Sequence, residues 1–201
     1  MNSKLLFAVA SMLMVVQANG VAGDAAAGGA KSAMCASCHM PDGNSVVDMF
    51  PKLAGQGENY IVKQLSDFKA GKRSNGTMTP MAMMVADADM ADIGAYFAKQ
   101  VATPGTADDS KLKLGKDVFQ GGNSITGVPA CSGCHSPTGK GNAPARYPAL
   151  AGQHATYIIT QLNAFRDGSR NNDQNGMMRS VVAHMTTAEI EAVANYVTTL
   201  K

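Results

Sequence analysis

Two stretches of the chain carry the same helical pattern of apolar and polar residues. Residues 55–73 and 152–170 align without a gap and share nine of nineteen residues, which are Gly, Gln, Tyr, Ile, Gln, Leu, Phe, Gly and Arg in that order. The shared tyrosine, isoleucine, leucine and phenylalanine fall on one face of an α-helix. Gly71 and Gly168 are typical helix ends. The pattern therefore predicts one amphipathic helix in each of two copies of a repeated unit.

A further helix is predicted at the end of each copy. The closing helices are expected at 86–100, with Met90, Ile93, Tyr96 and Phe97 on the apolar face, and at 186–200, with Ile190, Val193, Tyr196 and Val197. Asp87 and either Thr186 or Thr187 are the expected N-caps, and Glu189 supports the second start as part of a capping box. Because no alternating, β-branched run is long enough for a strand, the predicted class is all-α.

The repeat divides the chain into two tandem domains. Each begins with a shorter helix, expected at 24–34 and at about 110–120. Only one stretch between the copies has the composition of a linker, with a Thr-Pro-Gly-Thr sequence. We place the first domain at 23–102, the linker at 103–109 and the second domain at 110–201.

The first 22 residues have the pattern of a secretory signal peptide. Lys4 precedes an apolar run at 5–16, and small residues follow at Ala18, Gly20 and Ala22. The run is too short to span a bilayer, which takes about 20 apolar residues. We therefore expect cleavage after Gly20 or Ala22 rather than an uncleaved anchor, and a location in the bacterial periplasm.

Composition and charge exclude some classes of function. Without Lys4, the chain has 16 basic and 15 acidic side chains and no basic stripe, so we expect no nucleic-acid partner. The 201 residues contain no tryptophan, five tyrosines and six phenylalanines. Two domains of that composition would have thin apolar cores, which a bound cofactor in each could complete.

All four cysteines belong to one repeated motif, Cys-x-x-Cys-His. The motif uses Cys35 and Cys38 in the first copy, with His39, and Cys131 and Cys134 in the second, with His135. A zinc ribbon would bring its cysteine pairs closer in sequence, and a thioredoxin-like motif would lie near a βαβ pattern. The spacing instead indicates c-type haem attachment, with the histidine as an axial ligand. We predict two covalent haem c groups.

The second axial ligand must be chosen from fourteen methionines, most of which are expected to fill the core. Measured back from the closing-helix tyrosine, only one distance, 18 residues, has a methionine in both copies. It selects Met78 and Met178, expected in a loop opposite the histidine; Met81 and Met177 are the nearest rivals. His154 and His184 could also compete as ligands. Because neither has a histidine partner in the other copy, we interpret them as surface or locally hydrogen-bonded residues.

Two repeated pairs could support the cofactors. A ligating histidine usually donates its other ring N–H to a carbonyl or carboxylate, and the segments at Pro51 and Pro148 could supply that carbonyl. Arg73 and Arg170 could pair with haem propionates. The alternative is that these arginines are solvated charges near helix C-termini.

The chain resembles the di-haem cytochromes c4 over its whole mature length. The motifs that carry the resemblance are GDAAAG at 23–28, CASCH at 35–39, PDGNS at 41–45, FPKLAGQGE at 50–58, PACSGCHSP at 129–137 and GQHATY at 152–157. The resemblance implies two cytochrome c domains related by a pseudo-two-fold axis, with the propionate edges of the haems near the interface. It implies His/Met ligation, with the methionines at Met78 and Met178.

These expectations define an electron carrier rather than an enzyme. We expect a periplasmic monomer, at most peripherally attached to the membrane. The resemblance implies a quinol–cytochrome c oxidoreductase as donor and a terminal oxidase as acceptor in a respiratory chain. Two alternatives belong to other classes: a di-haem peroxidase-like enzyme with one open iron site, and a haem subunit of a dehydrogenase complex.

Overall fold

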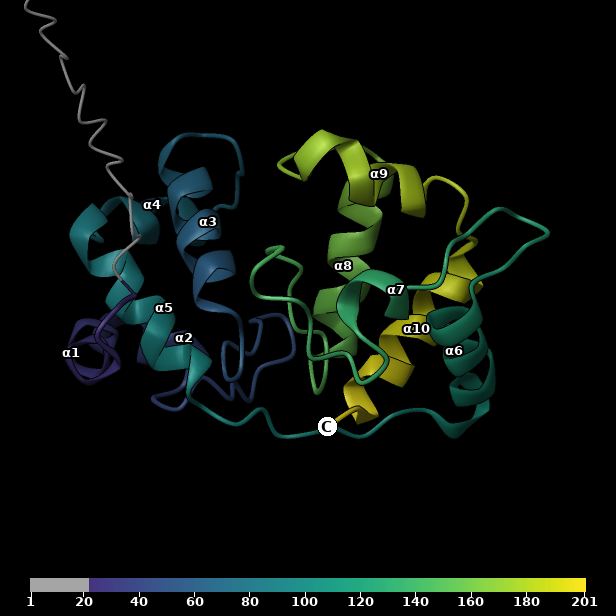
Figure 1. The fold of residues 1–201 in the computed structure, drawn as a ribbon, viewed down its shortest axis with the longest axis horizontal. Coiled ribbons are helices and arrows are strands. Elements are labelled where there is room, and N and C mark those ends of the chain that lie inside the picture. The colour runs from purple at the N-terminus through teal and green to yellow at the C-terminus, as the bar shows by residue number, and fades with distance from the viewer. Residues whose placement is uncertain (1–21) are drawn as a thin grey trace, which may run out of the picture.

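The helices that the pattern predicts form two similar lobes in a computed structural model of the protein, which describes residues 22–201 (Figure 1). The predicted signal peptide lies outside the described residues except for Ala22. The first lobe contains α1 (Ala25–Lys31), η1 (Ala33–Cys35), α2 (Ala36–His39), α3 (Glu58–Lys69), α4 (Met78–Met83), η2 (Asp87–Asp89) and α5 (Met90–Ala98). The second contains α6 (Asp109–Gly121), α7 (Ser132–His135), α8 (Ala155–Arg166), η3 (Gln174–Gly176), α9 (Met177–Val182) and α10 (Thr187–Thr199).

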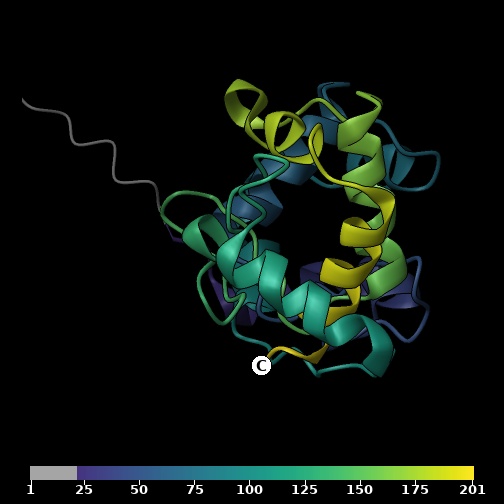
Figure 2. The same cartoon turned by 90° about the vertical axis from the view of Figure 1, so that its right-hand side faces the viewer.

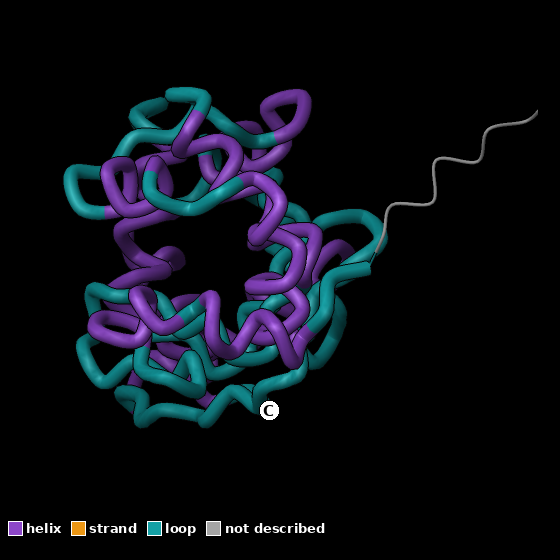
Figure 3. The backbone as a smooth tube through the Cα atoms, turned by 90° about the vertical axis from the view of Figure 1, so that its left-hand side faces the viewer, coloured by secondary structure: helices purple, strands orange, loops and turns teal. Residues whose placement is uncertain are grey.

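The described residues contain no strand, as Figure 3 shows, but they include two isolated bridges, between Asn123 and Val128 and between Asn142 and Tyr147. The predicted all-α class is therefore confirmed. Over 22–201, no helix is long and apolar enough to cross a membrane.

Each lobe has its own apolar core, built by the same three helices of the repeat. In the first, α1 and α3 pack on α5; in the second, α6 and α8 pack on α10 (Figure 2). The backbone of α1 comes close to α5 at Gly28, and that of α6 comes close to α10 at Gly115, because glycine has no side chain. A Cβ atom at Gly28 would lie 2.0 Å from the carbonyl oxygen of Asp92, and one at Gly115 would lie 2.1 Å from that of Ala192.

Two local predictions about the helix ends need correction. Asp87 does not cap α5, which begins at Met90; its carboxylate instead accepts a bond of 2.6 Å from Lys69 Nζ. Met78 and Met178 do not lie in loops but in the first turns of the short helices α4 and α9. The prediction for the last helix is confirmed, because Thr186 and Glu189 form a reciprocal capping box at the start of α10.

The two lobes meet through hydrogen bonds that are reciprocal between the copies. Gln153 accepts from the backbone N–H of Lys52 at 2.8 Å and donates to its carbonyl at 2.9 Å. Gln56 does the same with Ala149, at 2.8 and 3.1 Å. Each residue in one set has the repeat position of a residue in the other. Such an exchange is the pattern of a two-fold interface, here within one chain.

Candidate haem sites

Each Cys-x-x-Cys-His motif forms a single helical turn that directs its side chains toward a cavity. The turn is α2 in the first lobe and α7 in the second, and each ends in its histidine. All four cysteines, which lie in the described part of the chain, are free thiols. Burial raises the pKa of the Cys35 thiol, and it raises that of Cys131 to about 11.

The two histidines are buried and held by proline carbonyls, as the sequence predicts. His39 Nδ1 donates to the carbonyl of Pro51 at 2.8 Å, and His135 Nδ1 donates to that of Pro148 at 2.9 Å. Burial lowers the pKa of both rings, and the bond to the carbonyl offsets this only in part. Each ring is therefore neutral with its proton on Nδ1, which leaves the lone pair of Nε2 free to ligate a metal.

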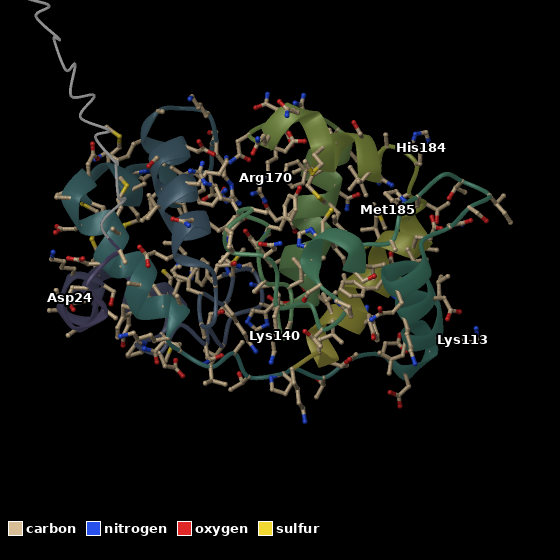
Figure 4. All side chains as sticks on the ribbon, in the orientation of Figure 1. Asp24, Lys113, Lys140, Arg170, His184 and Met185 are labelled. Carbon is tan, nitrogen blue, oxygen red and sulfur yellow. The ribbon has the colours of Figure 1, made fainter. Side chains whose placement is uncertain are left out.

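One cavity of about 600 Å³ extends through both lobes and collects every predicted site residue. Its walls include all four cysteines, both motif histidines, Met78 and Met178. The rivals Met81 and Met177 line the same cavity, so the structure does not choose between the methionines of α4 and α9. The other predicted competitors are not part of it: His184 is exposed (Figure 4), and His154 is bonded elsewhere.

The prediction for His154, a place at the surface or a local hydrogen bond, is wrong. The Nε2 atom of His154 lies 2.8 Å from the carbonyl oxygen of Ser45 and 3.0 Å from the Ser45 hydroxyl, and Ser45 belongs to the other lobe. The absence of a histidine in the other copy correctly argued against a repeated ligand. It could not show that the residue faces the interface.

Arg73 and Arg170 line the cavity and bond across the lobes, and Figure 4 shows Arg170 where the two lobes meet. Arg73 donates to Tyr157 at 3.1 Å and to Gln161 at 2.8 Å, while Arg170 donates to Tyr60 at 3.1 Å and to Gln64 at 3.2 Å. Each arginine also bonds the glutamine of its own lobe, at 2.7 Å. Each guanidinium further stacks on a phenylalanine of its own lobe, 4.7 Å from the Phe68 centroid and 4.4 Å from that of Phe165.

These contacts bring the two positively charged guanidinium groups close together at the interface between the lobes. The interpretation of solvated charges is wrong for Arg170, which is only 8% exposed. Within the described residues neither guanidinium forms a salt bridge, so two neighbouring cations share neutral acceptors alone. Burial by itself would raise the pKa of the Tyr60 hydroxyl, but the charges of Arg170 and Arg73 outweigh it and lower that pKa.

The residues present fit two haem c groups. Each lobe brings to one cavity a pair of free thiols, a neutral imidazole with its Nε2 unbonded to protein, and thioethers from a facing helix. Thiols suit thioether attachment, and imidazole and thioether are the axial donors of cytochromes c. The arginine pair adds positive charge where the cavity spans the lobes, which suits the carboxylates that a haem carries.

Comparisons with known proteins identify the family. The family model for cytochrome c matches residues 26–100 and again 112–201. The chain is 47% identical to a cytochrome c4 of Pseudomonas aeruginosa, over 97% of this chain and 98% of that protein. It is 38% identical to a thiosulfate dehydrogenase electron acceptor of Stutzerimonas stutzeri, over 95% and 92% of the two chains.

A solved structure supports the same assignment. Reduced recombinant cytochrome c4 from Pseudomonas stutzeri superimposes with a TM-score of 0.86 at 46% identity, and the match covers 90% of this chain and all of that one. Fold, donor set and similarity over nearly the whole chain lead to one conclusion. The chain belongs to the cytochrome c4 family of electron-transfer proteins, with two cytochrome c domains and a haem c in each.

Proposed function

We propose that this protein is exported to the periplasm and carries single electrons in a respiratory chain, from a quinol–cytochrome c oxidoreductase to a terminal oxidase. The observation that supports the proposal is the repeated donor set: each lobe places a motif histidine and two methionines of a short helix on one cavity. The domains are those expected at 23–102 and 110–201, joined by the linker 103–109, and the protein acts as a monomer.

The side chains of the cavity account for carrier chemistry. Haem c, when bound, supplies the one-electron couple. His39 and His135 present a neutral Nε2 because Nδ1 is held by a proline carbonyl. Met78 and Met178, in the first turns of α4 and α9, would supply the second protein ligand of each haem iron, which would leave no free position for a substrate. Arg73 and Arg170, which line the same cavity, would provide counter-charges for the propionates.

A second candidate follows from one similarity. A relative at 38% identity is named as the electron acceptor of thiosulfate dehydrogenase, so this chain could instead accept electrons from a dehydrogenase as its haem subunit. Stoichiometric co-purification with a catalytic chain would favour that role over a respiratory shuttle. A peroxidase-like enzyme is disfavoured, because both lobes offer methionines for the second axial position.

Axial substitutions test the ligand assignment in the haem-loaded protein. In Met178→Ala, the second haem loses its thioether, so half of the Met–Fe(III) charge-transfer absorption disappears and one reduction potential falls. Met78→Ala has the same effect on the first haem. Met83→Ala is the control, because Met83 is 59% exposed on the same helix as Met78. An unchanged spectrum in Met178→Ala, with loss in Met177→Ala, would assign the ligand to the rival instead.

A further inference from the structure

The two lobes are related by a two-fold pattern, but the two edges of their interface differ in charge. At one edge the chain forms a polar cavity of about 510 Å³. The residues that line it are Lys63, Asp67, Lys72, Arg146, Asn171, Asn172, Asp173 and Gln174. We call Lys63, Lys72 and Arg146 the cationic edge.

The residues that correspond to the charged residues Lys63, Asp67, Lys72 and Arg146 in the other copy of the repeat are uncharged. By the offset of 97 residues that relates the copies, Lys63 corresponds to Thr160, Asp67 to Ala164, Lys72 to Ser169 and Arg146 to Met49. The glutamines and arginines at the centre of the interface, by contrast, are the same in both copies. The two copies therefore have the same residues at the centre of the interface but differ in charge at this edge.

The carboxylates of this cavity are already neutralised. Asp67 is in a salt bridge with Lys63 and accepts from Asn172 at 2.6 Å, and Asp173 pairs with Arg179 at 2.8 Å. Lys72 and Arg146 are exposed and form no salt bridge within the described residues. The edge thus presents two uncompensated positive charges to solvent.

The backbone holds Arg146 in an unusual conformation. Its φ of 60° lies in the left-handed region that favours glycine, and the turn is closed by two bonds between Asn142 and Tyr147, of 2.9 and 3.0 Å. Strain of this kind persists where surrounding structure imposes it, often at functional sites. Arg146 and Lys63 line both this cavity and the haem cavity, so the cationic edge adjoins the haem cavity.

We infer that the cationic edge is the docking surface for a redox partner protein with an acidic surface, and that the opposite edge at Met49 and Thr160, which lacks these cations, is not used by that partner. The inference rests on the proposed carrier function. Two exposed cations beside the haem cavity would draw an acidic surface toward the cofactors and accelerate encounter at low salt. The cavity is larger than a single oxyanion needs, and the two cations without a salt-bridge partner, Lys72 and Arg146, are both exposed to solvent.

Oxidation of the reduced holoprotein tests the inference with two inorganic probes, anionic hexacyanoferrate(III) and a cationic cobalt(III) tris-phenanthroline complex. In Lys72→Gln/Arg146→Gln, the second-order rate with hexacyanoferrate should fall about fivefold at low ionic strength, and this difference should vanish at high salt. The rate with the cationic probe should not fall. The matched control is Lys113→Gln/Lys116→Gln, which removes the same formal charge from two exposed positions of α6; Figure 4 shows Lys113 in the outer part of the second lobe.

Each outcome has a separate meaning. Equal losses with hexacyanoferrate in the edge and control variants would show that only net charge matters and would overturn the inference. Failure of both probes to oxidise the wild-type protein would instead contradict the carrier function. A polyglutamate of about 20 residues should inhibit the hexacyanoferrate reaction of the wild type and not that of the edge variant. Inorganic phosphate inhibiting as strongly at equal charge concentration would indicate a small-anion site and overturn the protein partner.

Discussion

Gln153 is expected to contribute strongly to the connection between the lobes. In Gln153→Ala, the backbone N–H and C=O of Lys52 both lose their partner, at an interface where Lys52 is 7% and Gln153 is 5% exposed. A buried polar group left unpaired costs about 1–3 kcal/mol, so the two together should cost about 2–6 kcal/mol. This is a large fraction of the about 5–15 kcal/mol that stabilises a typical domain.

Urea unfolding of the holoprotein at pH 7, followed by far-ultraviolet circular dichroism, measures this loss. Because the substitution weakens the coupling between the lobes, we also expect their unfolding transitions to separate. Gln120→Ala is the control: Gln120 makes one exposed bond, of 2.8 Å, to the Pro137 carbonyl, and its loss should cost less than about 0.5 kcal/mol. A loss in Gln153→Ala no larger than that of the control would refute the reasoning.

Two further predictions concern single lobes. Gly28→Ala should destabilise the first lobe by about 1–3 kcal/mol in urea unfolding, because the added methyl group would lie 2.0 Å from the carbonyl oxygen of Asp92. The control is Gly29→Ala, whose nearest neighbour is a tyrosine ring atom at 3.3 Å, and it should be neutral or stabilising. Equal effects of the two substitutions would contradict the packing argument. Burial raises the pKa of Glu189, but hydrogen bonds from Asn123 and Thr186 outweigh it, so the folded-state pKa lies below 4.5. Stability from this carboxylate is therefore present above pH 4.5 and lost as pH falls through the folded value, and Glu189→Gln should flatten that acid dependence of the urea midpoint.

Local patterns in the sequence predicted much of the fold and of the site. The shared helix, the Thr186 capping box and the proline carbonyls depend on residues within about 15 positions of one another, so spacing alone could find them. The short helices α4 and α9 were missed because neither has a pattern longer than two turns. Hydrogen-bond partners across the interface could not be predicted, because the spacing of residues within one copy does not show which surface of the other copy they contact. His154 and Arg170 are the clearest examples.

The shared glutamines also limit how the two halves of the molecule can change over time. The side-chain oxygens of Gln64 and Gln161 each accept from both arginines, so one substitution at either position alters contacts in both domains at once. A duplicated sequence normally frees one copy to drift. Here the residues at the centre must change together, whereas an outer position such as Gln120, whose side chain bonds only Pro137 of its own lobe, can change alone.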